Sequence, residues 1–172
     1  VMLPGSILMG LLGPVMGRIY DARGPKILLI PGTIFVAAAL LSYSTVGSQT
    51  PVWWIVSTQI VMALGLAGSF TPLFSASLGS LQRHLYSHGS AVLNTLQQVA
   101  GAAGTALLIG IYSASLHSGA TAGLTVVQAG EPGAHSAFRL AMIIAMVAVV
   151  LSIFVRKPEE DETQPRVVNT DD

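Results

Sequence analysis

Five stretches of apolar residues follow one another along the chain, separated by short connections that are polar or contain Gly and Pro. A helix rises about 1.5 Å per residue and the hydrocarbon core of a bilayer is about 30 Å thick, so about twenty apolar residues can span it. The pattern therefore predicts an all-α fold, a polytopic transmembrane helix bundle. The predicted spans cover approximately residues 1–20, 27–46, 52–74, 90–112 and 137–155.

The scarcity of charge supports this interpretation. Of the 172 residues, 52% are hydrophobic and only 9% are charged, whereas a soluble domain carries roughly 25% charged residues. Most of the charged residues follow Val155, in a tail (residues 156–172) that has too few large apolar groups to fold and is expected to be a disordered cytoplasmic segment. The charged residues of the body are Arg18, Asp21, Arg23, Lys26, Arg83, Glu131 and Arg139.

Composition also argues against several function classes. The net charge is zero and the body has no strongly basic stretch, so the electrostatic footprint of a nucleic-acid-binding protein is missing. The absence of cysteine from the sequence rules out disulfides, thiolate metal sites and cysteine nucleophiles within it. The chain begins with Val1 inside an apolar run, without a basic leader before it, which suggests a truncated start.

Lys and Arg gather at alternate connections, as expected where cytoplasmic loops hold an excess of them. The second connection (residues 47–51) and the long fourth connection (113–136) contain neither, and only Arg139 goes against the pattern. We therefore predict a multi-pass protein of the cell membrane with a cytoplasmic C-terminus. The basic residues are Arg18, Arg23 and Lys26 at the first connection, Arg83 in the third connection, and Arg156, Lys157 and Arg166 after the last span.

The first connection reads as helix, tight turn, helix. Gly24 permits a tight turn and Pro25 fits the first turn of the helix that follows. Asp21 can accept hydrogen bonds from the free N–H groups at the start of that helix, while Arg23 and Lys26 supply positive charge.

This segment resembles the major facilitator superfamily, whose loop between the second and third helices of a six-helix half has the pattern Gly-x-x-x-Asp-Arg-x-Gly-Arg-Arg/Lys. Gly17, Asp21, Gly24 and Lys26 match this pattern, and Arg23 lies within it. Ala22 and Pro25 depart from it, as is common in the weaker copy of the motif in the C-terminal half. The resemblance implies that these residues form a conformational-gating loop.

A second resemblance lies in the fourth span, which is similar to the penultimate helix of the fourteen-helix drug:proton antiporters, the EmrB/QacA-like subfamily. Its features are an Asn94-Thr95 pair, then Gln97-Gln98, then a Gly-rich stretch up to residue 106. The third span, with Gly65, Gly68 and Pro72, is similar to the helix before it.

The resemblance implies that the chain is the C-terminal part of a proton-coupled efflux transporter. Its substrate would be a small amphiphilic molecule, bound near the bilayer midplane between two halves, of which the N-terminal one is absent from this sequence. Since no Asp or Glu lies deep within a predicted span, the residues that bind the coupling proton would lie outside this chain.

Intramembrane polar side chains are the default functional candidates, because each is costly in hydrocarbon unless it finds a partner or faces water. Asn94, Gln97, Gln98 and Gln59 are the candidates for lining a substrate pathway. Hydrogen bonds between helices are the alternative role for each of them.

No enzyme, metal or cofactor is indicated. His84 and His88 have a spacing that could bind a metal on one helix face, but no carboxylate or third ligand lies near them in sequence. Only these histidines and Asp21 could supply catalytic groups for an enzyme. Two alternatives to drug efflux stay open: a carrier for a specific small metabolite in the same superfamily, and a non-transporting membrane accessory protein.

Overall fold

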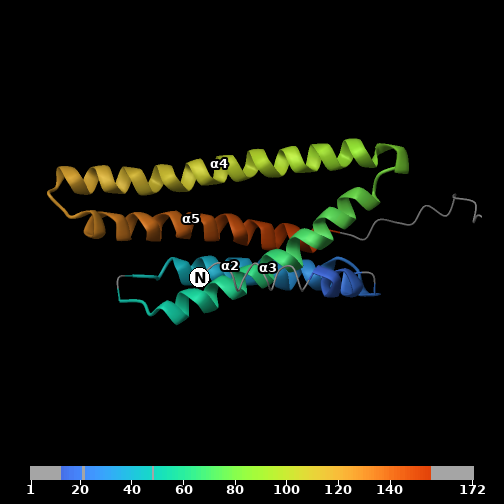
Figure 1. Cartoon of the computed structure of the whole chain (residues 1–172), viewed down its shortest axis with the longest axis horizontal. Helices are drawn as coiled ribbons and strands as arrows, with labels where there is room; N and C mark the ends of the chain where they lie inside the picture. Colours follow the sequence, from blue (N-terminus) through green and yellow to red (C-terminus); the bar gives the residue numbers. More distant parts are fainter. Residues whose placement is uncertain (1–12, 21, 48, 156–172) are drawn as a thin grey trace, which may run out of the picture.

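A computed structural model of the chain describes residues 13–20, 22–47 and 49–155 (Figure 1). Most of the predicted first span, the residue Asp21 and the predicted tail (156–172) therefore lie outside the described residues. Residues 13–20 and 22–23 are helical. The elements that follow are α2 (Lys26–Tyr43), α3 (Val52–Gly79), the short 3-10 helix η1 (Arg83–Leu85), α4 (Tyr86–Thr121) and α5 (Val126–Phe154).

All regular elements in the described part of the chain are helices, which confirms the predicted all-α class. Helices α2, α3, α4 and α5 are each long and apolar enough to cross a membrane. Helix α2 packs against both α3 and α5, and α4 packs chiefly against α5. The buried core between α2 and α5 contains Ala37, Leu40 and Ala145, with Val36, Met62, Phe138, Ala141, Met142 and Val149 packed around it.

The last two helices are longer than the sequence pattern predicted. We expected a connection over residues 113–136, but residues 113–121 continue α4 and residues 126–136 belong to α5, so that only residues 122–125 join them. With 36 residues, α4 is about 54 Å long by the usual rise per residue. The end of the α4–α5 hairpin (residues 113–136) extends beyond the α2–α3 connection in Figure 1.

Small side chains and a helix cap explain why residues 113–121 and 126–136 are helical. Ser115 donates a hydrogen bond to the carbonyl of Ala129 at 2.7 Å, and Gly119 lies against Ala129, so the two helices approach closely where the sequence is least apolar. Gly123 (φ +75°) turns the chain, and Thr125 with Gln128 forms a capping box that starts α5. The Thr-x-x-Gln signature was the signal in the sequence that could have located this start.

Helices α2 and α3 touch through their backbones. A methyl group at Gly65 would lie 2.8 Å from the carbonyl oxygen of Gly32 and 2.8 Å from the backbone nitrogen of Val36. A methyl group at Gly32 would meet Ser69 and Gly68 equally closely. Such contact is possible only because these positions have no side chain, as is typical of helix pairs in lipid.

The connections fall at two opposite ends of the bundle (Figure 1). The turn at residues 24–25, the η1 segment and the last residues of α5 lie at one end, and the α2–α3 and α4–α5 connections lie at the other. Arg23, Lys26 and Arg83 belong to the first end, which is the one that the Lys and Arg count predicts to be cytoplasmic.

The close contact at Gly65 leads to a test of packing. Because the methyl group of Gly65→Ala would meet backbone atoms that cannot rotate away, we expect this variant to lose about 1–3 kcal/mol of unfolding free energy. Gly101→Ala, on α4, is the matched control: its methyl group would meet nothing within 4 Å in the described part of the chain, and the helix gains propensity. Denaturation of the 172-residue chain in detergent micelles, followed by the fluorescence of Trp53 and Trp54, measures both. Equal unfolding free energies for the two variants would contradict the assigned contact.

Candidate functional site

The turn of the loop motif is built as its residues predict. The N–H of Gly24 donates to the carbonyl of Tyr20 at 2.8 Å, and Gly24 has a φ of +79°, so it ends the first helix in the left-handed conformation. Pro25 follows as the N-cap of α2, and its carbonyl accepts a hydrogen bond from the N–H of Leu29 at 2.9 Å. Two residues thus reverse the chain between consecutive helices.

The other motif residues surround this turn. Arg23 and Lys26 are exposed on either side of it, where their charges can reach water or lipid headgroups. A methyl group at Gly17 would meet nothing within 4 Å, so in the described part of the chain no second helix backbone approaches this glycine. Asp21 lies outside the described residues.

The amides of α4 form an open polar face. Asn94 and Gln98 lie one helical turn apart, on the same side of α4, and Gln97 lies beside them. All three side chains are exposed, and none makes a hydrogen bond with another described residue. Their neighbour Thr95 instead donates to the carbonyl of Ala91 within the helix, at 2.8 Å. In hydrocarbon, free amides of this kind require a polar partner or water.

Gln59 lies in a different environment. Its side-chain oxygen accepts a hydrogen bond from the hydroxyl of Tyr43 at 2.8 Å, and the Tyr43 ring stacks on Phe138 with a centroid distance of 5.3 Å. One position earlier, the hydroxyls of Thr58 and Ser42 are hydrogen-bonded at 2.9 Å. Gln59 therefore has a partner between helices α2 and α3, which the amides of α4 lack.

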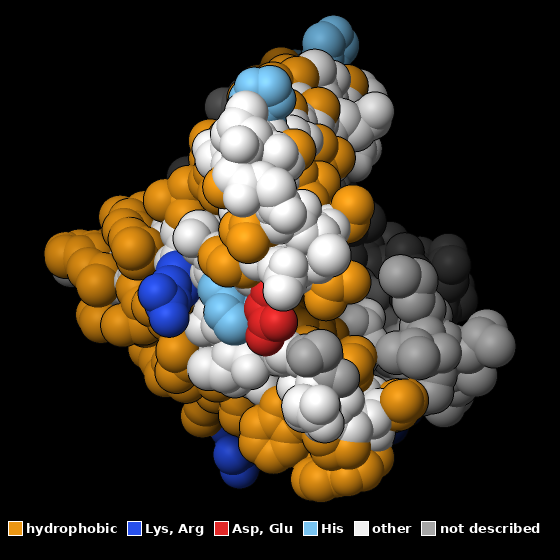
Figure 2. All heavy atoms as spheres, turned by 90° about the vertical axis from the view of Figure 1, so that its left-hand side faces the viewer, with side chains coloured by type: hydrophobic (Ala, Val, Ile, Leu, Met, Phe, Trp, Pro, Cys, Tyr) orange, Lys and Arg blue, Asp and Glu red, His pale blue; other side chains and the backbone are white. Residues whose placement is uncertain are grey.

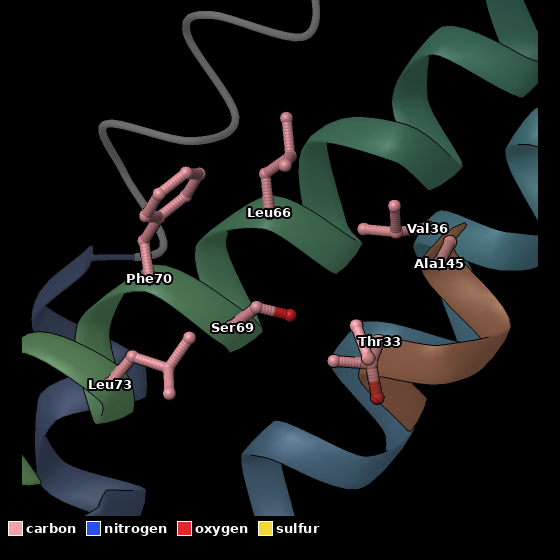
Figure 3. Close-up of a pocket in the computed structure, with 8 residues that line it drawn as sticks. Thr33, Val36, Leu66, Ser69, Phe70, Leu73 and Ala145 are labelled. Carbon is pink, nitrogen blue, oxygen red and sulfur yellow. The ribbon is translucent and has the colours of Figure 1, made fainter. Parts of the chain in front are cut away.

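An apolar pocket of about 190 Å³, which the sequence analysis did not identify, lies between α2, α3 and α5 (Figure 3). Thr33 and Ser69 line it, yet their hydroxyls donate to carbonyls of their own helices, Thr33 to Leu29 at 2.9 Å and Ser69 to Gly65 at 2.8 Å. The pocket can thus accommodate an apolar group but offers it no free donor. Its other lining residues are Val36, Leu66, Phe70, Leu73, Ala145 and Ala148.

The structure does not bring the predicted residues into one site. The motif turn lies at one end of the bundle, the amides of Asn94 and Gln98 lie along α4, and Gln59 lies between α2 and α3. No described residue of α4 lines the apolar pocket. Among the described residues, no group of three or more His, Asp and Glu side chains could hold a metal ion.

Comparisons with known proteins identify relatives along almost the whole chain. The chain is 37% identical to the uncharacterized MFS-type transporter YcnB of Bacillus subtilis, over 96% of this chain and 35% of that protein. It is 34% identical to the lincomycin resistance protein LmrB of the same organism, over 94% of this chain and 35% of LmrB. The multidrug resistance protein B homolog of Mycobacterium tuberculosis is 33% identical over 55% of this chain and 18% of its own length.

The chain therefore spans about a third of the length of the curated relatives YcnB and LmrB. No family model matches the sequence. No solved structure matches it either.

The motif turn gives a prediction about Gly24. Because an Ala side chain is strained at a φ of +79°, we expect Gly24→Ala to lower the unfolding free energy of the chain by about 1 kcal/mol. Gly24→Asn should lose less, since Asn tolerates the left-handed conformation. Gly13→Ala, in the helix before the turn, is the control, because its methyl group would meet no described residue within 4 Å. Denaturation in detergent micelles gives the unfolding free energy of each of the three variants. Equal unfolding free energies for Gly24→Ala and Gly13→Ala would contradict the prediction that Gly24 lies in a strained turn.

Proposed function

Because the chain is homologous over nearly all of its length to part of the MFS-type transporters, and so belongs to that family, we propose that it is the C-terminal portion of a proton-coupled efflux transporter. Its substrates are drugs or other amphiphilic compounds, which it moves across the cell membrane. The names of two relatives, a lincomycin resistance protein and a multidrug resistance protein B homolog, support this substrate class. The apolar helices support a multi-pass membrane protein.

The free amides of α4 are the observation that carries the proposal. Asn94, Gln97 and Gln98 are exposed on a helix that is apolar enough to cross the membrane, and they have no polar partner among the described residues. An amide left unpaired in hydrocarbon costs several kcal/mol. In the whole transporter this face of α4 therefore lies against the N-terminal half or a water-filled pathway between the halves, where substrates of such transporters bind.

The motif turn has a separate role in this proposal. Gly17, Asp21, Arg23, Gly24 and Lys26 form the cytoplasmic gating loop, and the placement of Arg23 and Lys26 at the end of the bundle that also holds Arg83 supports a cytoplasmic position. Because α5 ends at that same end of the bundle, we expect the segment that follows it in sequence to be cytoplasmic too. The groups that couple transport to protons belong to the part of the transporter that lies outside this chain.

Export of a fluorescent cationic dye from efflux-deficient cells tests the proposed function. The gene is expressed with its native upstream sequence, and dye accumulation is followed with and without a protonophore. We expect dye to be lost from these cells, and the loss to stop when the protonophore is added. A loss that the protonophore does not affect would contradict proton coupling, and no loss across a panel of dyes would contradict drug efflux.

The same assay tests the role of the α4 amides. We expect Asn94→Leu combined with Gln98→Leu to slow export roughly tenfold, which is equivalent to losing about 1.4 kcal/mol of polar interaction along the pathway. Gln49→Leu is the control, because it makes the same chemical change on the exposed α2–α3 connection. All variants are compared at equal amounts in the membrane. If the double variant exports dye at the same rate as the control, the amides of Asn94 and Gln98 do not line the pathway.

A further inference from the structure

The apolar pocket between α2, α3 and α5 is open on one side. Helices α3 and α5 both pack on α2, but within the described part of the chain their backbones do not approach each other. The floor of the pocket is buried, since Thr33 and Ser69 are each 8% exposed and Ala145 is 9% exposed. Leu73 and Ala148 also line the pocket, yet both are exposed. The pocket is therefore a groove over α2, with its mouth between α3 and α5 (Figure 3).

The mouth of the groove is directed toward the end of the bundle that holds the motif turn. On α3, the exposed residue Leu73 follows the buried residue Ser69 by one helical turn. On α5, the exposed residue Ala148 follows the buried residue Ala145 by nearly one turn. Both helices run toward the motif end at these positions (Figure 1). A molecule can thus enter the groove from the membrane leaflet at that end.

The interior of the groove is suited to a hydrocarbon chain. The hydroxyls of Thr33 and Ser69 donate to carbonyls of their own helices, so no described side chain in the groove offers a free donor. An apolar cavity of about 150 Å³ stays dry and binds benzene. The groove, with about 190 Å³, can hold an apolar group at least as large. If it stayed empty, its walls would lose dispersion contacts, and in a bilayer the surrounding acyl chains can supply them.

A basic side chain lies on the same side of α2 as the groove. Lys26 precedes Thr33 by two helical turns, about 10 Å along the helix axis, and it is exposed. The first turn of α2 contains no acidic residue that could neutralise it. A lysine near the end of a membrane helix extends its ammonium group to the level of the lipid headgroups. A lipid at this place would therefore have its headgroup at Lys26 and its acyl chain beside Thr33.

The charge balance of the motif end favours a negative headgroup. Residues 18–26 contain three basic residues, Arg18, Arg23 and Lys26, and one acidic residue, Asp21. In the part of the chain that the structure describes, the one carboxylate side chain is that of Glu131. It lies against the α2–α3 connection at the opposite end of the bundle, where Figure 2 shows an acidic side chain. The excess of positive charge at the motif end thus complements an anionic lipid.

We propose that the groove binds one acyl chain of an anionic phospholipid whose phosphate lies at Lys26. The ammonium group of Lys26 donates charge-assisted hydrogen bonds to the phosphate. The acyl chain lies along α2 toward Thr33, with α3 and α5 on either side, and so fills the space between two helices that do not meet. The cytoplasmic leaflet as the source of this lipid rests on the orientation given in the proposed function, whereas the groove and its lysine do not.

Photo-crosslinking with a lipid probe tests this site. The gene is expressed with its native upstream sequence, and the purified protein is reconstituted in phosphatidylcholine vesicles that contain a small fraction of a phosphatidylglycerol with a diazirine in one acyl chain. A phosphatidylcholine with the same diazirine is the matched probe. Mass spectrometry locates the labelled residues after illumination. We expect Phe70 and Leu73 to be labelled about fivefold more by the phosphatidylglycerol probe, the factor that one basic residue contributes beside an anionic lipid.

Two pairs of variants separate the groove from the headgroup contact. Ala148→Phe places a ring in the mouth of the groove and should lower the labelling of Leu73 several-fold. Ala103→Phe makes the same change at an exposed position of α4 and should leave this labelling as it is. Lys26→Gln should bring the yields of the two probes close together. Arg139→Gln removes an exposed charge from a residue that does not line the groove, and the difference between the probes should persist.

Two results with the unsubstituted protein would overturn the site, even if a variant failed to insert. The first is labelling that is absent from the groove, as expected if another protein segment filled it, or that is spread evenly over the lipid-facing residues. The second is an equal yield for the two probes, which would exclude the anionic headgroup. Because the labelling does not depend on transport, a protein that exports no dye can still support this site, and an active exporter can still contradict it.

Discussion

Backbone contact between α2 and α3 sets the arrangement of the other described helices. In lipid, apolar side chains gain little by meeting each other rather than acyl chains, so helices associate where small residues let their backbones approach. Gly32 faces Gly65 and Gly68 in this way, and α5 packs onto α2 around Ala145. Side-chain hydrogen bonds then link the same helices, from Ser42 to Thr58 and from Tyr43 to Gln59.

Helix α4 stands outside this arrangement. It packs on α5 through small residues near its C-terminal end, and Gly119 is the only buried residue along it. A membrane helix with so little burial and with free amides needs a polar partner or water beyond the described residues. Helices α2, α3 and α5 thus bury the core of the described bundle, and α4 presents an exposed polar face.

Hydropathy predicted the fold class and the approximate position of α2, α3, α4 and α5, because the bilayer sets both the length and the apolarity of a spanning helix. It missed the extensions of α4 and α5, since Ser, Gly and Ala have low hydropathy whether they form a loop or a tightly packed helix pair. Gly24 and Pro25 were predictable because their backbone preferences are local. The pairing of Gln59 with Tyr43, and of His135 with Val46, was not, because each joins residues far apart in sequence.

The two ends of the bundle are held by different kinds of contact. At the motif end, Gly24 and Pro25 hold the chain by backbone conformation, which no change of pH alters. At the opposite end, a single hydrogen bond joins the ring of His135 on α5 to the backbone carbonyl of Val46. The histidine contact depends on one side chain, whereas the close packing of α2 on α3 is made by backbone atoms of both helices, which cannot rotate away. The contact between α2 and α3 is therefore the more rigid of the two.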